Sequence, residues 1–156
     1  MHIGVISDTH MVISSIERLE KEIKGVDVLI HLGDNVADVA TIEKHYKGKI
    51  INVKGNCDFS ESVPNDRLIE IGEKKIFLTH GHNYGVKENL SGLRYKALET
   101  GADIVLYGHT HVAKIDFEDG IWYINPGSAS LPRDGDRSYV IITINQGNIE
   151  PKVIRF

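Results

Sequence analysis

Residues 103–111 are Asp-Ile-Val-Leu-Tyr-Gly-His-Thr-His, an apolar run that ends in a glycine and is followed by two histidines one residue apart. The run is short and rich in β-branched residues, which predicts a buried strand. In an extended continuation, alternate side chains point the same way, with their Cα atoms roughly 6.5–7 Å apart. That separation would let His109 and His111 each serve a different ion of a metal pair. Taken alone, the motif favours a polar turn that binds nothing, because histidine occurs in many turns without binding a metal.

The length and composition indicate a soluble globular protein. The chain has 156 residues, of which 41% are hydrophobic and 26% are charged, and a net charge of −4, so we expect a single domain spanning residues 1–156. The acidic balance gives no support for binding long nucleic acid or a membrane surface. A single cysteine, Cys57, excludes an internal disulfide. The chain enters a strand without a leader-like segment and has no long apolar run, so we expect a cytoplasmic protein.

The order of the predicted elements changes half-way along the chain. Strands and helices alternate first, and antiparallel strands follow, which predicts two packed sheets with helices outside. The predicted strands are 2–7, 26–32, 49–54, 67–71, 75–79, 104–109, 112–117, 121–124, 138–144 and 149–154, and the predicted helices are 12–24, 38–46 and 87–100. In the first helix, Ile13, Ile16, Leu19 and Ile23 have core spacing, whereas Glu17, Arg18, Glu20, Lys21 and Glu22 form the solvated face.

Five of the predicted apolar strands end in residues that can bind a metal ion. These residues are Asp8 and His10, Asp34, Asn56, His80, and His109 with His111. Ligand sites of α/β sheets gather at the carboxyl ends of the strands. Two carboxylates, one amide and four imidazoles are too many ligands for one four-coordinate ion and suit two ions that share a carboxylate. Solvated loop ends with hydrogen-bonded histidines are the alternative interpretation.

The same blocks resemble those of the calcineurin-like metallophosphoesterases. Asp8-Thr9-His10, Gly33-Asp34, Gly55-Asn56, His80-Gly81-His82 and Gly108-His109-Thr110-His111 carry the resemblance, and Asn125-Pro126-Gly127-Ser128 is similar to a segment of the small single-domain phosphodiesterases. The resemblance implies a four-layer α/β/β/α sandwich. It implies that Asp8, His10 and His111 hold one ion, that Asn56, His80 and His109 hold the other, and that Asp34 bridges them. It further implies hydrolysis by a hydroxide held between the ions that attacks phosphorus in line.

One position departs from the family pattern. Many of these phosphatases have a histidine after Gly-Asn that assists the leaving group, whereas this chain has Cys57 followed by Asp58. A thiol is a poor proton donor to an alkoxide. We therefore predict either that His82 supplies the proton or that the leaving group needs little help, as in small aryl or cyclic phosphodiesters. Asn56 is a candidate for contacting the phosphate, Asp58 for orienting a ligand or capping the turn, and Arg133 for binding the phosphate.

The remaining expectations concern the metal, the partners and the other histidines. Mn²⁺ is our first choice for the two divalent ions, and Ni²⁺, Zn²⁺ or Fe would also suit the ligands. The alternatives are a nuclease or phosphatase of the same superfamily, or a protein-interaction scaffold resembling its vacuolar-sorting members. Self-association is left open. We expect His2 and His45 to ligate nothing, His31 to be hydrogen-bonded in the core, and Trp122 and Tyr123 to be core residues. Cys57 is as compatible with buried loop packing as with a functional role.

Overall fold

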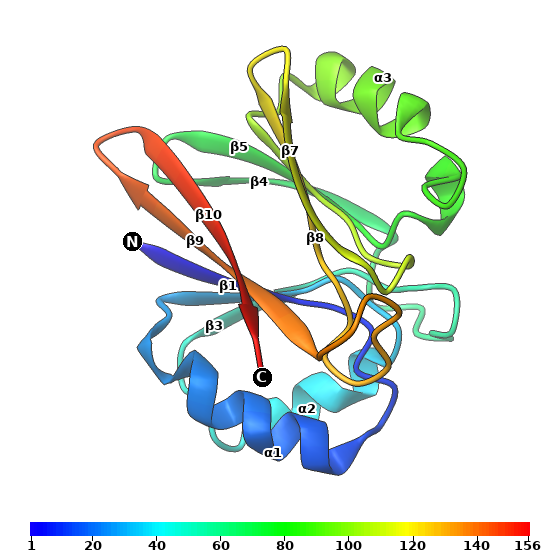
Figure 1. Ribbon diagram of the computed structural model, residues 1–156, viewed down its shortest axis with the longest axis vertical. Helices are drawn as coiled ribbons and strands as arrows, with labels where there is room; N and C mark the ends of the chain where they lie inside the picture. Colours follow the sequence, from blue (N-terminus) through cyan, green and yellow to red (C-terminus); the bar gives the residue numbers. More distant parts are fainter.

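The computed structural model describes residues 1–156 except for the side chains of Ile13 and Glu20, so the orientations predicted for these two lie outside it. Two mixed five-stranded sheets pack face to face (Figure 1). The first has the order β10-β9-β1-β2-β3 and consists of β1 (His2–Ile6), β2 (Val28–His31), β3 (Lys49–Asn52), β9 (Ser138–Asn145) and β10 (Asn148–Arg155). The second has the order β4-β5-β6-β8-β7 and consists of β4 (Asp66–Ile71), β5 (Lys74–Thr79), β6 (Ile104–Leu106), β7 (Ala113–Glu118) and β8 (Ile121–Pro126).

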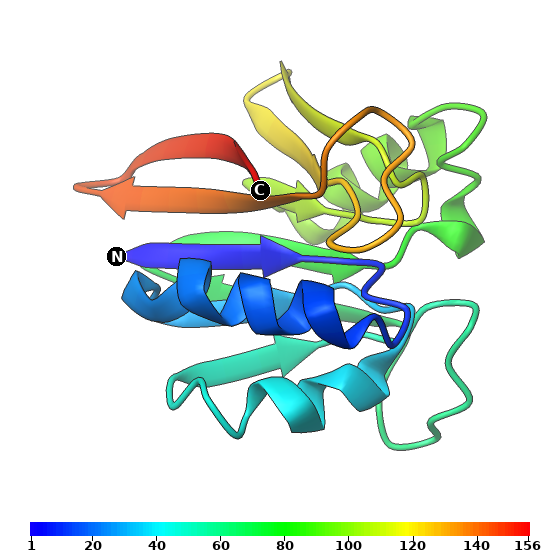
Figure 2. The same ribbon diagram turned by 60° about the horizontal axis from the view of Figure 1, so that its bottom comes forward.

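Helices cover the outer face of each sheet, which confirms the predicted four-layer sandwich. The helices α1 (Ile13–Glu22) and α2 (Val39–Ile42) lie below the first sheet, and α3 (Ser91–Thr100) lies above the second (Figures 1 and 2). Short 3₁₀ turns span Ile23–Gly25, Val36–Asp38 and His82–Tyr84. In the part of the chain that the structure describes, no helix has the length and apolar character needed to cross a membrane.

Alternation along the strands divides the apolar side chains between three cores. Ile3 and Val5 of β1 face the core between the sheets, whereas Ile6 faces the core under α1. On β5, Phe77 joins the core under α3, while its neighbours Ile76 and Leu78 point between the sheets. This period of two follows from the pleat of a strand. The inter-sheet core fixes how the two sheets meet and therefore where their strand ends lie.

Two of the predicted helices are shorter in the structure. The second was expected over 38–46, but its α-helical part is Val39–Ile42, and residues 43–45 continue as turns. The third was expected from Lys87 and begins at Ser91, because the Asn89 side chain accepts a hydrogen bond from the Ser91 backbone N–H at 2.9 Å. Asparagine side chains compete for backbone donors in this way and set helix starts.

Candidate metal centre

The seven predicted ligands all lie beyond the carboxyl ends of strands, and both sheets contribute. Asp8 and His10 follow β1, Asp34 follows β2 and Asn56 follows β3 in the first sheet, while His80 follows β5, and His109 and His111 follow β6 in the second. In Figure 2 the strands β1 and β3 point toward the end of the molecule where these loops lie. The site is therefore built at the junction of the two sheets.

Four of these residues form a compact cluster. One ligand atom from each of Asp8, His10, Asp34 and His111 lies within 4.8 Å of the others. The His111 Nε2 atom is 3.1 Å from Asp8 Oδ1 and 3.4 Å from His10 Nε2. Two carboxylates and two imidazoles at this spacing form the mixed oxygen and nitrogen set that divalent transition metals bind.

His80 and His109 extend the cluster from the second sheet. The Nε2 atom of His80 is 3.4 Å from Asp34 Oδ1 and 3.9 Å from Asp8 Oδ1. The ring of His109 lies 5.1 Å from that of His80 between centroids. Asn56 is less integrated, because its side chain is exposed and its amide donates a hydrogen bond to the Cys57 sulfur at 3.4 Å. The individual ligand roles of all seven residues stay predictions.

Backbone carbonyls orient two of the imidazoles. His80 Nδ1 donates to the Leu32 carbonyl at 2.8 Å, and His111 Nδ1 donates to the Leu131 carbonyl at 2.7 Å. Each bond leaves the Nε2 lone pair facing the carboxylates, which is the arrangement seen for metal-binding histidines. Asp8 Oδ1 and His80 Nε2 are both buried and have no hydrogen-bond partner among the described residues. Buried polar atoms of this kind need a partner, and a divalent cation fits this donor set.

The electrostatics of the cluster keep both carboxylates ionised. Burial acts to raise the pKa of Asp8 and Asp34, but the nearby imidazoles of His111 and His80 outweigh it, and both pKa values fall below the ordinary range. Burial and the neighbouring His80 lower the pKa of His109 to about 4, so this imidazole is neutral near pH 7. Ionised carboxylates and a neutral imidazole are the protonation states that metal binding requires.

The predicted extended conformation of the two histidines after β6 is wrong. His109 has φ 68° and His111 has φ 60°, both in the left-handed region. The buried Asn125 determines this turn, since its amide donates to the Gly108 carbonyl at 2.9 Å and to Thr110 Oγ1 at 3.0 Å. The chain therefore coils between the two histidines, and their positions are set by a tight loop rather than by strand alternation.

Comparison with known proteins agrees with this geometry. Residues 1–147 match the calcineurin-like phosphoesterase superfamily domain. This chain belongs to that superfamily. The probable metallophosphoesterase YsnB of Bacillus subtilis is 37% identical over 146 residues, which cover 92% of this chain and 85% of YsnB. The phosphodiesterase MJ0936 of Methanocaldococcus jannaschii is 32% identical over 145 residues, which cover 81% of this chain and 83% of MJ0936.

Two solved structures have the same fold as this chain. A predicted phosphoesterase from Streptococcus pneumoniae superposes with a TM-score of 0.84 at 33% identity, covering 99% of this chain and 88% of that one. Vps29 from Entamoeba histolytica, solved with zinc, superposes with a TM-score of 0.79 at 22% identity, covering 99% of each chain. The second likeness concerns the fold alone. Both sheets and their packing are thus shared across these proteins.

Asp58 binds the backbone of two loops that carry predicted ligands. Its carboxylate accepts four backbone N–H bonds of 2.8–2.9 Å, from Asp34, Asn35, Val36 and Gly55. It therefore joins the loop after β2 to the loop after β3 and fixes the backbone of Asp34. These bonds are compatible with both roles considered for Asp58, orienting a ligand and capping the turn, and its role stays a prediction.

The other residues singled out in the sequence are placed as follows. The His82 ring lies 5.5 Å from that of His80 and 6.1 Å from that of His109, and its half-buried position lowers its pKa. The Arg133 side chain is exposed, and its backbone N–H donates to the His111 carbonyl at 2.9 Å. Cys57 is exposed, so the buried-packing alternative is wrong. Its backbone N–H donates to Asp34 Oδ1 at 3.0 Å.

The structure places the remaining histidines and aromatic residues outside the ligand cluster. His31 is fully buried; it accepts the Gly33 N–H at Nδ1 and its Nε2 faces Thr9 Oγ1, both at 3.1 Å, as expected for a core histidine. His2 is exposed and its Nδ1 lies 3.1 Å from Thr143 Oγ1, outside the cluster. His45 lies after α2, away from the ligand loops. Tyr123 is buried, while Trp122 is only partly buried.

Sequence reasoning missed the residues that hold the Asp8 backbone. The hydroxyls of Ser128 and Ser130 both donate to the Asp8 carbonyl at 2.8 Å, although they are more than a hundred residues away in the chain. Both serines are buried. The only sequence signal is the turn chemistry of the segment around Pro126 and Gly127, which marks a loop but not what the loop contacts.

Proposed function

We propose that this phosphoesterase is a two-ion hydrolase of small phosphodiesters. The observation that carries the proposal is the convergence of Asp8, His10, Asp34 and His111, with the unpartnered Nε2 atom of His80 beside them. Divalent ions supply Lewis-acid activation of water and of the phosphoryl group. We assign Asp8, His10 and His111 to one ion, Asn56, His80 and His109 to the other, and Asp34 to both. Mn²⁺ is the ion we would test first.

The residues around the centre support a diester rather than an alkyl monoester as substrate. Cys57 stands where many members of the superfamily have a histidine, and its exposed thiol is a weak proton donor. The His82 ring lies beside the rings of His80 and His109. We assign to it the proton for the leaving-group oxygen. Aryl and cyclic leaving groups need least assistance, and the similar MJ0936 protein is itself described as a phosphodiesterase.

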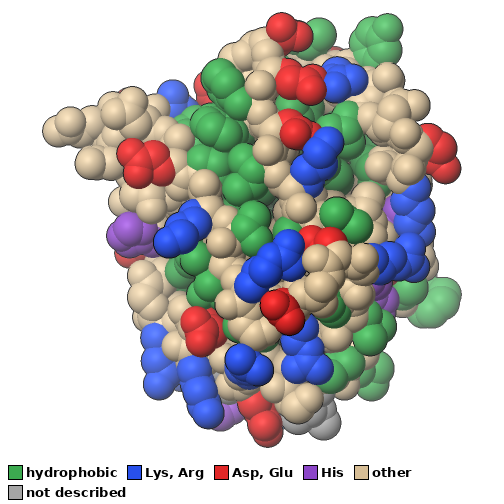
Figure 3. All heavy atoms as spheres, viewed as in Figure 1, with side chains coloured by type: hydrophobic (Ala, Val, Ile, Leu, Met, Phe, Trp, Pro, Cys, Tyr) green, Lys and Arg blue, Asp and Glu red, His purple; other side chains and the backbone are tan. Residues whose placement is uncertain are grey.

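A small substrate also agrees with the surface charge. On the face drawn in Figure 3, Lys and Arg side chains are interspersed with Asp and Glu rather than gathered into a basic patch. Long nucleic acid is bound chiefly through such patches. We therefore propose a small soluble phosphodiester as the partner of the site, in keeping with the net charge of −4.

The alternative from another functional class is a protein-interaction scaffold. Vps29 shares the fold at 22% identity, which says nothing of this chain's partners. A scaffold does not need metal ligands, whereas this chain has a competent ligand at all seven predicted positions, six of them in mutual proximity. This observation favours the enzyme.

The direct test is hydrolysis of bis(p-nitrophenyl) phosphate by metal-stripped protein before and after addition of Mn²⁺, Ni²⁺ or Zn²⁺. We expect turnover only with added metal. Asp34→Asn should lower turnover by at least about 100-fold, because this carboxylate would serve both ions. p-Nitrophenyl phosphate, a monoester with the same chromophore, should react more slowly. Absence of turnover with every ion, in protein that binds two ions, would contradict the enzyme assignment.

A further inference from the structure

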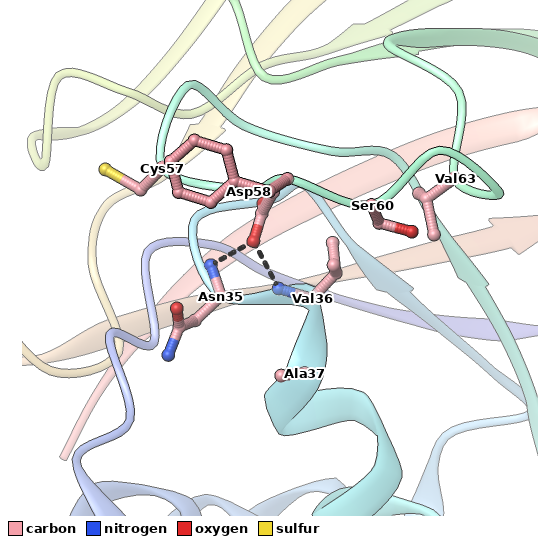
Figure 4. A pocket seen from close by; sticks show the side chains of 8 residues that line it. Asn35, Val36, Ala37, Cys57, Asp58, Ser60 and Val63 are labelled. Atoms are coloured by element: carbon pink, nitrogen blue, oxygen red, sulfur yellow. Dashed lines mark hydrogen bonds between the residues drawn. The ribbon is translucent and has the colours of Figure 1, made fainter.

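A pocket of about 450 Å³ opens beside the metal centre, between the loop after β2 and the loop after β3. Figure 4 shows Val36 and Ala37 on one wall and Cys57, Ser60 and Val63 on the other. Asp58 lies between the walls and accepts the backbone N–H groups of Asn35 and Val36 (dashed lines in Figure 4). The same carboxylate that fixes Asp34 therefore also holds this pocket open.

The pocket and the metal centre share a wall. Cys57 is one of the residues that line the pocket, and its backbone N–H donates to Asp34 Oδ1 at 3.0 Å. Asn35, another lining residue, directly follows Asp34. A group bonded to a phosphorus atom at the centre would have the pocket as its adjacent cavity. A volume of this size suits a small organic group.

The lining selects for an uncharged, flat group rather than for phosphate. No Lys, Arg or His is among the residues that line it, and both Asp58 oxygens already accept backbone N–H bonds. Phe59 lies at the pocket with 96% of its surface exposed. An aromatic side chain exposed to this extent buries almost none of its apolar area in the fold, whereas a flat ring stacked on it would remove part of that area from water. Aromatic side chains are the usual stacking surfaces for nucleobases.

We propose that this pocket binds the aromatic substituent of the phosphodiester, an aryl ring or a nucleobase, with the Phe59 ring stacked on it. The inference rests on the proposed function, since it needs the phosphate to be held at the metal centre. It adds a substrate class to that function, namely esters that carry at least one flat aromatic group. It also assigns specificity to a residue that takes no part in the chemistry.

The test compares two phosphonates that do not react. We would titrate Mn²⁺-loaded protein calorimetrically with phenylphosphonate and with methylphosphonate, and repeat both titrations with Phe59→Ala, Val63→Ser and Tyr95→Ala. Phe59 is too exposed for its loss to affect folding. Val63→Ser puts a hydroxyl into the pocket wall, and Tyr95, which is 77% exposed on α3, serves as the matched aromatic control.

We expect phenylphosphonate to bind about tenfold more tightly than methylphosphonate to the unsubstituted protein, as for a single stacked ring. This ratio should fall toward one in Phe59→Ala, decrease in Val63→Ser and stay unchanged in Tyr95→Ala, while the affinity for methylphosphonate stays constant. A ratio near one in the unsubstituted protein would overturn the pocket assignment and leave the phosphoesterase intact. The pocket assignment would also be overturned if the protein self-associates with rising concentration and Phe59→Ala abolishes this self-association without changing the ratio of the two phosphonate affinities. If methylphosphonate does not bind at all, the phosphate site itself is wrong and the proposed function fails with it.

Discussion

The backbone at the predicted ligands is held in a conformation that non-glycine residues rarely adopt. Positive φ angles of 47–68° occur at Asp8, His10, Asp34, His109 and His111. Such angles cost about 1–3 kcal/mol each and persist only where the surrounding structure imposes them. Here the imposing contacts are hydrogen bonds between loops, such as Asp8 N–H to the Gly33 carbonyl at 3.0 Å. We conclude that hydrogen bonds between the loops hold the backbone of the predicted ligands in place.

Asp58 provides the first prediction at this scale. Asp58→Asn keeps the size of the side chain but replaces one carboxylate oxygen by an NH₂ group. Two of the four backbone N–H groups then face a donor instead of an acceptor. We expect a loss of about 2–3 kcal/mol in the free energy of unfolding and a fall of about 10–100-fold in metal affinity. Urea unfolding and metal titration measure the two effects.

Glu61→Gln is the matched control for Asp58, because Glu61 is an exposed carboxylate in the same loop. It should change stability by less than about 0.5 kcal/mol. If both substitutions have equally small effects, the four hydrogen bonds do not support the site.

His31 gives a prediction about pH. Burial lowers its pKa from 6.5 to about 4, so between these pH values the unfolded chain binds a proton that the folded chain does not. Stability therefore falls as pH drops through this window, by up to about 3 kcal/mol at pH 4. His31→Gln should remove this part of the pH dependence, whatever its effect at pH 7. Identical slopes of unfolding free energy against pH in both proteins would contradict the burial of a neutral His31.

At the scale of the elements, the site depends on loops that touch through their backbones. A Cβ atom at Gly55 would lie 2.1 Å from Asp34 Oδ1 and 2.6 Å from the Asp34 nitrogen. Gly55→Ala should displace the Asp34 loop, and a displacement of about 1 Å is enough to lower turnover by about 100-fold. The measurement is metal-dependent hydrolysis of the bis-aryl diester.

Gly25→Ala is the control for Gly55, since nothing lies within 4 Å of a Cβ atom there and its φ is not positive. It should leave turnover unchanged and stability equal or slightly higher. Full activity in Gly55→Ala would mean that the two loops can separate without harm to the site.

The same elements show what could be predicted from the sequence. Strand alternation and helical spacing were sufficient for both sheets and for α1, and the clustering of ligands at strand ends followed from parallel topology. The helix start at Ser91 and the coiled loop at His109 could not be predicted, because single hydrogen bonds from Asn89 and Asn125 decide them. The roles of Ser128 and Ser130 could not be predicted either, because the Asp8 carbonyl to which they donate lies far away in the sequence.

At the scale of the whole molecule, the inter-sheet core brings two half-sites together. Asp8, His10, Asp34 and Asn56 come from the first sheet, and His80, His109 and His111 come from the second. Neither sheet alone supplies a complete set of ligands for either of the two proposed ions. The packing of Ile3, Val5, Ile76 and Ile104 between the sheets is thus a condition for metal binding as well as for stability.

The number of ions bound per chain tests this account most directly. Mn²⁺-saturated protein, freed of excess metal by gel filtration, should contain two ions per chain by mass spectrometry of the metal. His10→Ala, in the first sheet, and His109→Ala, in the second, should each lower the count toward one. One ion in the unsubstituted protein, or a count that neither substitution changes, would contradict a two-ion centre assembled across both sheets.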